Sequence, residues 1–240
     1  LVRSRGLGDV YKRQIPYRDI SAVVHKCLSE PYQSNDEETV KEWVLAHQRV
    51  VDVAWERFGT VLPSGFDTII KGNGTVSAEE NLKKWLEENY EKLKDNLERV
   101  KGKAEVGVQI FLDRKVVAHA LMKASEEMKG LNEEMKEKTP GMAYFYMQKI
   151  QRALKRELEG KADEYFKDSY GRIKKYADAM RIEKTKKTEG DRQMIMNLSL
   201  LIQKDKIKLL GEELTKIKEA KGVETRFTGP WPPYSFVTAT

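Results

Sequence analysis

Residues 117–165 read VAHALMKASEEMKGLNEEMKEKTPGMAYFYMQKIQRALKRELEGKADEY, and this stretch decides the fold of the second half of the chain. Two apolar repeats with spacings of three and four residues run through it, one on each side of Thr139-Pro140-Gly141. Such spacing is typical of a coiled-coil seam, and the Pro-Gly pair interrupts it. We therefore predict two helices that fold back on each other as a protruding antiparallel hairpin over about residues 114–180. The seam positions are Val117, Leu121, Ala124, Met128, Leu131 and Met135, then Met147, Ile150, Leu154, Leu158, Ala162 and Tyr165.

Strands and one further helix flank this hairpin. Their order, which is strand, hairpin, strand, helix, strand, is an α+β pattern. We place a domain boundary near residues 101–103, so that the C-terminal domain covers residues 104–240 and includes a tail at 227–237. The strands are expected at residues 105–112, 194–202 and 223–227, and the helix carries Ile207, Leu210, Leu214 and Ile217, with Gly222 as its C-terminal cap.

Residues 15–103 predict an N-terminal α+β domain. Pro63 and Gly65 interrupt its apolar run at 60–70, which favours an edge strand or a bulged extended segment over a central strand. The remaining elements are expected to be a strand at 20–25, a helix from about Asp36 to Phe58, and a single helix that begins at Ser77 and carries Leu82, Leu86, Tyr90, Leu93 and Leu97.

The first fourteen residues differ from the rest of the chain. They lack a hydrophobic period, and residues 4–14 match the in-frame translation of a transposon-end sequencing adapter. We therefore interpret residues 1–14 as a sequencing-adapter artefact and expect the natural N-terminus to be missing; a natural basic, Gly-rich arm is the alternative. The segment holds four basic residues and one acidic residue. Without it, the net charge of +6 becomes +3, from 40 basic and 37 acidic residues.

The composition narrows the possible classes of function. Apolar residues form 40% of the 240-residue chain and charged residues 34%, which is typical of a globular protein with solvated helices. No uncharged apolar run approaches the roughly 20 residues that span a bilayer, so we expect no membrane partner. A single cysteine, Cys27, excludes an internal disulfide and fits a reducing, cytoplasmic environment. The near balance of charge over residues 15–240 argues against a nucleic-acid partner.

Few residues support catalysis or metal binding. His25, His47 and His119 are isolated from one another, and none is spaced from Cys27 as a pair of metal ligands would be. We interpret His47 as a hydrogen-bonded structural histidine and Cys27 as an inert core residue. The sequence therefore predicts no enzyme, no cofactor and no metal site.

Two other classes of function remain open at this point. A general coiled-coil adaptor or weak nucleic-acid-binding protein would use the lysines between Lys184 and Lys187. A hydrolase would pair His47 with Asp67 as base and carboxylate. Neither has a motif beyond these residue types.

The C-terminal tail is the least ordinary segment of the chain. Residues 227–237 read FTGPWPPYSFV, and the three prolines fix φ and remove three backbone donors. We predict an extended, polyproline-like chain that is neither helix nor central strand. Trp231, Tyr234 and Phe236 are large apolar groups, and we favour a tail that buries them and seals the core of its domain. A docking surface for a partner is the alternative.

The tail closely resembles the C-terminal signature of the gas vesicle protein GvpL/GvpF family, in which Thr-Gly-Pro-Trp-Pro-Pro-Tyr-Ser-Phe follows the last strand. The spacing of His47 and Val50, the Leu-Pro-x-x-Phe element, and residues 105–108 and 141–144 are also similar to family positions. Asp67 and Gly65 depart from the usual family residues. The resemblance covers residues 15–240. The candidate residues for docking onto a partner or onto the core are Gly229, Pro230, Trp231, Pro232, Pro233, Tyr234, Phe236, His47, Leu62, Pro63 and Phe66.

This resemblance implies a fold and a function. The fold would be two α+β domains, the C-terminal one ferredoxin-like with a long helical arm. The function would be that of a non-enzymatic accessory or minor structural protein of gas vesicles, the hollow protein shells that give aquatic microbes buoyancy. Its expected partners are the main shell protein and other gas vesicle accessory proteins. Its expected role is to assist vesicle nucleation or assembly in the cytoplasm.

Overall fold

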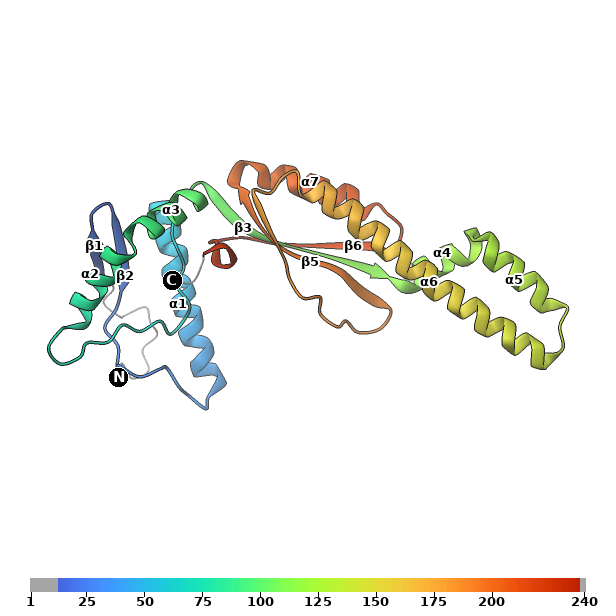
Figure 1. Ribbon diagram of the computed structural model, residues 1–240, viewed down its shortest axis with the longest axis horizontal. Coiled ribbons are helices and arrows are strands. Elements are labelled where there is room, and N and C mark those ends of the chain that lie inside the picture. The colour runs from blue at the N-terminus through green and yellow to red at the C-terminus, as the bar shows by residue number, and fades with distance from the viewer. Residues whose placement is uncertain (1–12, 238–240) are drawn as a thin grey trace. The chain divides into compact units, whose positions relative to one another are not determined.

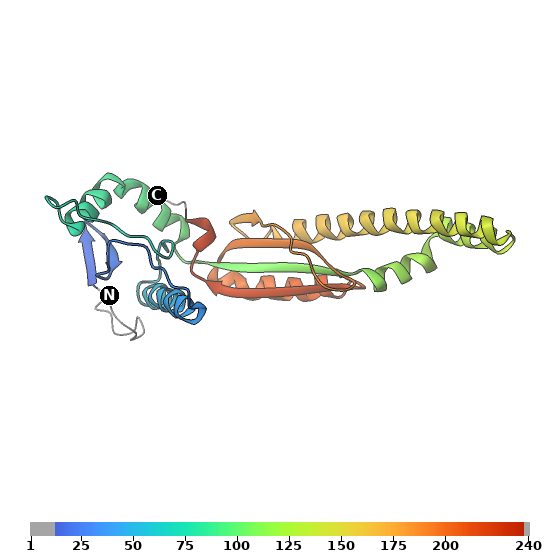
Figure 2. The ribbon, with the colours of Figure 1, turned by 90° about the horizontal axis from the view of Figure 1, so that it is seen from below.

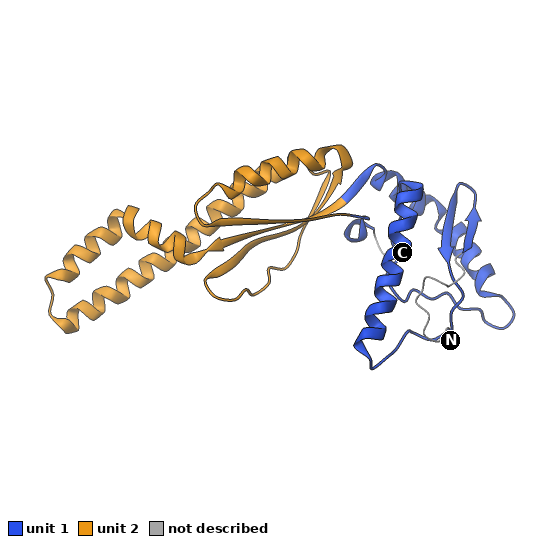
Figure 3. Cartoon of the chain, turned by 180° about the vertical axis from the view of Figure 1, so that it is seen from behind, with its two compact units in different colours: residues 1–104, 231–240 blue, residues 105–230 orange. Residues whose placement is uncertain are grey.

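The computed structural model describes residues 13–237 and combines helices with sheets (Figures 1 and 2). This confirms the mixed helix-and-sheet class expected from the sequence. The chain divides into two compact units, here called unit 1, residues 1–104 with 231–240, and unit 2, residues 105–230 (Figure 3). The division after residue 104 lies next to the expected boundary. The tail from Trp231 onward belongs to unit 1, whereas we expected it in the C-terminal domain.

Unit 1 consists of a strand hairpin, three helices and the end of the tail. The hairpin is antiparallel and pairs Tyr17 with Ile20 at its turn. Helix α1 begins after Asp36, whose carboxylate accepts hydrogen bonds from the backbone N–H groups of Glu38 and Thr39. The elements are β1 (Arg13–Tyr17), β2 (Ile20–Val24), α1 (Glu37–Phe58), α2 (Ala78–Glu88), α3 (Tyr90–Val100) and, after unit 2, the 3-10 helix η3 (Tyr234–Phe236).

Three features of unit 1 bear on the expectations from the sequence. Residues 13 and 14, which we assigned to the adapter-like segment, are the first positions of β1, and residues 1–12 lie outside the described part of the chain. The single helix expected after Ser77 is two helices, because Asn89 leaves helical geometry and its side-chain amide donates to the carbonyl of Trp85. Within residues 60–70, all of which the structure describes, no strand forms.

Unit 2 is a four-stranded sheet with helices packed on one face. The strand order is β4-β5-β3-β6, which makes β6 an edge strand, the position in a sheet that tolerates proline. The elements in chain order are β3 (Lys103–Asp113), α4 (Arg114–Ala124), α5 (Glu126–Lys136), α6 (Pro140–Ile173), β4 (Ala179–Ile182), β5 (Arg192–Gln203), the 3-10 helix η2 (Lys204–Lys206), α7 (Ile207–Lys218) and β6 (Val223–Trp231).

Alternate side chains of the two central strands, β3 and β5, form much of the core of unit 2. Successive side chains of a strand point to opposite faces, so one set meets the layer of α6 and α7 that Figure 1 shows above the strands. The Arg172 guanidinium on α6 also bonds the Glu213 carboxylate on α7 at 2.6 Å. The buried core comprises Val106, Val108, Ile110 and Leu112 of β3, Met196, Leu198, Leu200 and Ile202 of β5, and Leu158, Ile173, Leu210, Leu214 and Ile217 of the helices, with Val117 and Val223.

The helical hairpin differs from the expected one in its first arm. Ser125 is extended and divides that arm into α4 and α5, both of which pack against α6. The Ser125 hydroxyl accepts from the Met128 N–H at 3.4 Å and donates to the Glu157 carboxylate at 2.6 Å, which explains the break. Two expected seam residues, Ala124 and Met147, are exposed.

The second arm also ends earlier than expected. Helix α6 stops at Ile173 instead of continuing toward Met180, and residues 179–182 form the additional strand β4. Helix α7 ends at Lys218, so Gly222 is not its cap. Gly222 has φ +77°, and a Cβ there would lie 2.9 Å from Val117 Cγ2 on α4. Glycine is therefore required by the close turn between α7 and β6.

Candidate functional site

Unit 1 contains a cluster of aromatic rings at the start of α1. Trp43 and His47 lie one turn apart on the helix, and Phe66 comes from the loop that follows it. The Tyr32 ring lies 5.2 Å from the Trp43 ring and 5.7 Å from the Phe66 ring, measured between centroids. The His47 ring meets Phe66 edge to face at 5.9 Å. The structure therefore brings together two candidate residues that are 19 positions apart in sequence.

Hydrogen bonds link the residues of this aromatic cluster to their neighbours. The hydroxyl of Tyr32 bonds the His25 ring at 2.9 Å, and the Tyr32 N–H donates to the Asp67 carboxylate at 3.0 Å. His47 Nε2 contacts the carbonyl of Ser64 at 3.2 Å. Burial, followed by the nearby charges of Cys27 and Asp67, raises the pKa of Tyr32. His47 and Asp67 thus engage backbone groups, which is a structural use and not the pairing that a hydrolase would need.

The Leu-Pro-x-x-Phe element lies in the loop between α1 and α2. Pro63 is buried, whereas Leu62 and Phe66 are half-buried. Asp67 has φ +68°, a left-handed conformation that a glycine adopts more easily. The Asp67 carboxylate accepts from the Tyr32 N–H, which holds the side chain of this residue in place.

The tail continues β6 and then packs within unit 1. Gly229 and Pro230 are exposed and are joined by a cis peptide bond, whereas Pro232 and Pro233 are buried. Phe236 is 6% exposed, but Trp231 is 49% exposed. The expectation that all three aromatic residues are buried is therefore wrong for Trp231, because it ends the edge strand while the chain after it turns into η3.

Two hydrogen bonds attach the tail to the helices of unit 1. The Tyr234 hydroxyl donates to the Gln48 side-chain oxygen on α1 at 3.0 Å, next to His47 in sequence. The Arg99 guanidinium on α3 donates to the carbonyl of Phe236. Sequence reasoning missed both Gln48 and Arg99, because neither belongs to a motif and their partners lie more than 130 residues away. The short η3 helix was also unexpected in so proline-rich a segment.

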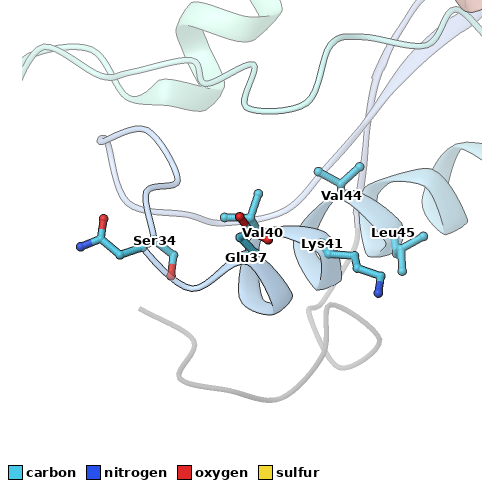
Figure 4. Close-up of a pocket in the computed structure, with 7 residues that line it drawn as sticks. Ser34, Glu37, Val40, Lys41, Val44 and Leu45 are labelled. Carbon is cyan, nitrogen blue, oxygen red and sulfur yellow. The ribbon is translucent and has the colours of Figure 1, made fainter. Parts of the chain in front are cut away.

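A surface pocket lies at the first turns of α1. Figure 4 shows the side chains of Val40, Val44 and Leu45 projecting from the helix beside it. All three are exposed apolar residues. Ser34, Asn35, Glu37 and Lys41 complete the lining. Three of its seven lining residues are therefore apolar, and four are polar or charged.

A second, basic pocket lies beside the loop between β4 and β5 in unit 2. Arg114, Lys186, Lys187 and Arg192 contribute its charge. Arg192 pairs with Glu224 at 2.7 Å, and its guanidinium lies 3.8 Å from the centroid of the Phe111 ring. Part of the positive charge that a nucleic-acid-binding protein would use is thus neutralised within the fold.

Residues 13–237 contain neither a metal-binding cluster nor a membrane-spanning helix. Within this range, no three His, Cys, Asp or Glu side chains are grouped so that they could hold a metal ion. None of the helices described there is both long and apolar enough to cross a bilayer. Cys27, expected in the core, is exposed, because it lies in the irregular chain after β2 and not in a strand.

The chain is similar to gas vesicle proteins in sequence and fold. The family model described as "Gas vesicle synthesis protein GvpL/GvpF" matches residues 3–238. Gas vesicle protein L1 of Halobacterium salinarum is 29% identical over 90% of this chain and 77% of its own length. Gas vesicle protein L of Haloferax mediterranei is 28% identical over 96% and 72%. The crystal structure of GvpF from Anabaena sp. PCC7120 matches with a TM-score of 0.74 and 20% identity, over 98% of this chain and 91% of that one.

Proposed function

The chain belongs to the gas vesicle synthesis protein GvpL/GvpF family, and from that premise we propose that it is a non-enzymatic accessory or minor structural protein of gas vesicles. In this role it binds the main shell protein and assists nucleation or assembly of the vesicle. Its place in the cell is the gas vesicle and its assembly intermediates. Membership of the family supports a part in gas vesicle formation; the binding partner and the step are our proposal.

The observation that carries this proposal is the extent of the family match, which spans residues 3–238. Both units and the tail are therefore included. Two of its relatives are called gas vesicle proteins L1 and L, and their alignments cover most of this chain. Similarity that extends over both units favours a shared role over an unrelated use of one domain.

We further propose that unit 2 is a ferredoxin-like domain that carries a coiled-coil arm. Its element order, one strand, helices, two strands, a helix and a last strand, supports this assignment, as does the strand order β4-β5-β3-β6. The packing of α4 and α5 against α6 supports the arm. In the proposed mechanism, this arm or the domains shield apolar surface of the shell subunit until it is incorporated.

Of the candidate residues, His47 is the one most easily interpreted as catalytic, but its contacts support a structural role. Its ring packs on Phe66 and contacts the Ser64 carbonyl, and the neighbouring Gln48 holds the tail. We propose that the signature residues of the tail fasten the end of the chain to α1 and α3. On this proposal, Tyr234 and Phe236 serve the core of unit 1, and exposed Trp231 remains accessible to a partner.

Co-purification tests the proposed function. The full chain, carrying an affinity tag, would be expressed together with the main shell protein, and the eluted complex would be quantified at low and high salt. We expect the shell protein to co-elute at both salt concentrations, because an apolar contact is only weakly screened. Absence of any complex, together with normal vesicles in cells that lack this protein, would contradict the proposal.

A further inference from the structure

The end of the hairpin formed by α5 and α6 carries large apolar side chains that the chain itself leaves exposed. Their exposed fractions are 51% for Met142, 60% for Tyr144, 64% for Phe145 and 47% for Met147. Within unit 2, this end of the hairpin is the part farthest from the sheet (Figures 1 and 2). Met142 and Phe145 lie three residues apart on one side of α6, and Tyr144 and Met147 lie on another, so the four surround the end of the arm, and together we call them the tip patch. Its aromatic and thioether groups fall within six consecutive positions of one helix.

The tip patch is not needed to hold the hairpin together. The buried residues of the arms are others, with Met128 at 1% exposure on α5, and Ile150 and Ala153 below 9% on α6. Tyr146 lies half-buried between patch residues and bonds Glu134 on the other arm, a bond that raises the pKa of the Tyr146 hydroxyl. The arms are therefore fixed by a separate set of contacts, and the patch is left available to a partner.

The charge pattern indicates the kind of partner. No charged residue occurs between Lys138 and Lys149, in a chain of which 34% of residues are charged. A charged group of a partner that was buried here would lose its water without gaining a counter-ion. The centres of protein–protein interfaces are enriched in Tyr, Phe and Met and depleted of charge, which is the composition of the patch. An uncharged, apolar protein surface is the complementary occupant.

We propose that the tip patch is the surface through which this protein contacts the main gas vesicle shell protein, at an apolar and uncharged part of that subunit. The inference rests on the proposed function and names its site. It places the contact on the exposed end of the arm and not on the buried seam between its helices. Met142 and Met147 give the patch flexible side chains that adapt to a partner surface, while Tyr144 and Phe145 supply larger, stiffer rings.

Co-expression with the shell protein tests the inference. In the tip variant, Met142→Gln, Tyr144→Gln, Phe145→Gln and Met147→Gln replace exposed apolar groups by good helix formers. The matched control carries Val40→Gln, Val44→Gln, Leu45→Gln and Val53→Gln, which change as many exposed apolar residues on α1. Circular dichroism melting verifies the fold. The single variant Phe145→Gln replaces the tip variant if the latter does not fold.

We expect the amount of co-purified shell protein to fall about tenfold in the tip variant and less than about twofold in the α1 control. Binding by a folded tip variant at the wild-type level overturns the inference while leaving the proposed function intact. So does a loss confined to the control, or a tip variant that loses only self-association or binding to phosphatidylcholine vesicles. If the wild-type chain itself retains no shell protein, the proposed function fails and the inference fails with it.

Discussion

The two units of this protein reach stability in different ways. Unit 2 has one continuous core, in which alternating residues of β3 and β5 meet α6 and α7. Unit 1 has a small cluster of buried residues, Ile15, Leu82 and Leu86, below the β1–β2 hairpin. Burial of regularly spaced apolar side chains contributes most of the stability of unit 2. In unit 1, ring contacts and hydrogen bonds between segments distant in sequence contribute a larger share.

The aromatic cluster and the tail show how unit 1 compensates for its small core. Tyr32, Phe66 and His47 contact one another through rings from separate loops and from α1. Tyr234 adds a bond from the end of the chain to Gln48. Because these contacts join segments that are far apart in sequence, unit 1 cannot be complete until the chain that follows unit 2 has returned to it.

The tryptophans allow the two units to be followed separately. Three of the four, Trp43, Trp55 and Trp85, lie in the helices of unit 1, and Trp231 lies at the boundary of the units, where β6 ends. Their fluorescence reports unfolding of unit 1, whereas circular dichroism at 222 nm reports the helices of both units.

The largest effect is expected in the core of unit 2. Leu198 on β5 is 1% exposed, and Leu198→Ala removes buried methyl groups from a site that cannot easily collapse. We expect the free energy of unfolding of unit 2 to fall by about 4 kcal/mol. The urea transition followed by circular dichroism should shift to lower concentration while the tryptophan transition stays in place. Equal shifts in both signals would show that the two cores are not separate.

A smaller loss is expected at the buried end of the tail. Phe236 is 6% exposed in unit 1, so Phe236→Ala should lower the free energy of unfolding of that unit by about 3 kcal/mol. Tryptophan fluorescence during urea unfolding measures the loss. A change below about 0.5 kcal/mol would mean that the tail does not complete unit 1.

A pH-dependent effect is expected at the turn of the β1–β2 hairpin. The Tyr90 hydroxyl, at 2.5 Å, and the Lys94 ammonium, at 3.0 Å, lower the pKa of Asp19 from 3.8 to about 2. The unfolded chain binds the proton first, so the stability that this carboxylate contributes is complete above pH 3.8 and is lost as the pH falls toward 2.

The variant Asp19→Asn tests this dependence. It should melt at a lower temperature than the wild-type chain at pH 6, and the difference should shrink between pH 3.8 and about 2. Melting of unit 1, followed by tryptophan fluorescence, is the measurement. A difference in melting temperature that stays constant over this range would contradict the assigned cause.

The smallest effect is expected at the exposed tryptophan of the tail. Trp231 is 49% exposed, so Trp231→Ala should lower the free energy of unfolding by about 1 kcal/mol, which is less than the loss for Phe236→Ala. Denaturation followed by circular dichroism measures this variant, because it removes one of the fluorophores. A loss as large as that of Phe236→Ala would place both rings in one core and remove the distinction between them.

Sequence reasoning succeeded where hydrophobic periodicity determines the structure. The strands β2, β3 and β5 and the helices α1 and α7 were found from the repeats of their apolar residues. The hairpin turn at Pro140 was found because proline cannot continue the helix before it. In these elements the local pattern and the tertiary core require the same side chains.

Sequence reasoning failed where a polar cap sets the end of a helix or where a contact joins residues distant in sequence. The apolar repeat continues past Ser125, but the serine side chain caps α5, and Ser-Glu-Glu is a helix-start signal that could have revealed the break. Strand β4 is only four residues long, and it begins where we expected the second helix of the hairpin to end, so the sequence analysis missed it. The contact of Tyr234 with Gln48 left no local signal, because its partners are 186 residues apart.

The central claim is that this protein assists gas vesicle formation by binding the shell protein through an exposed arm. Electron microscopy of cells that lack the protein, complemented by the wild-type chain or by the tip variant at equal expression, tests it most directly. We expect the wild-type chain to restore vesicles and the folded tip variant to restore few or none. Abundant vesicles in the uncomplemented cells, or equal restoration by both chains, would contradict the claim.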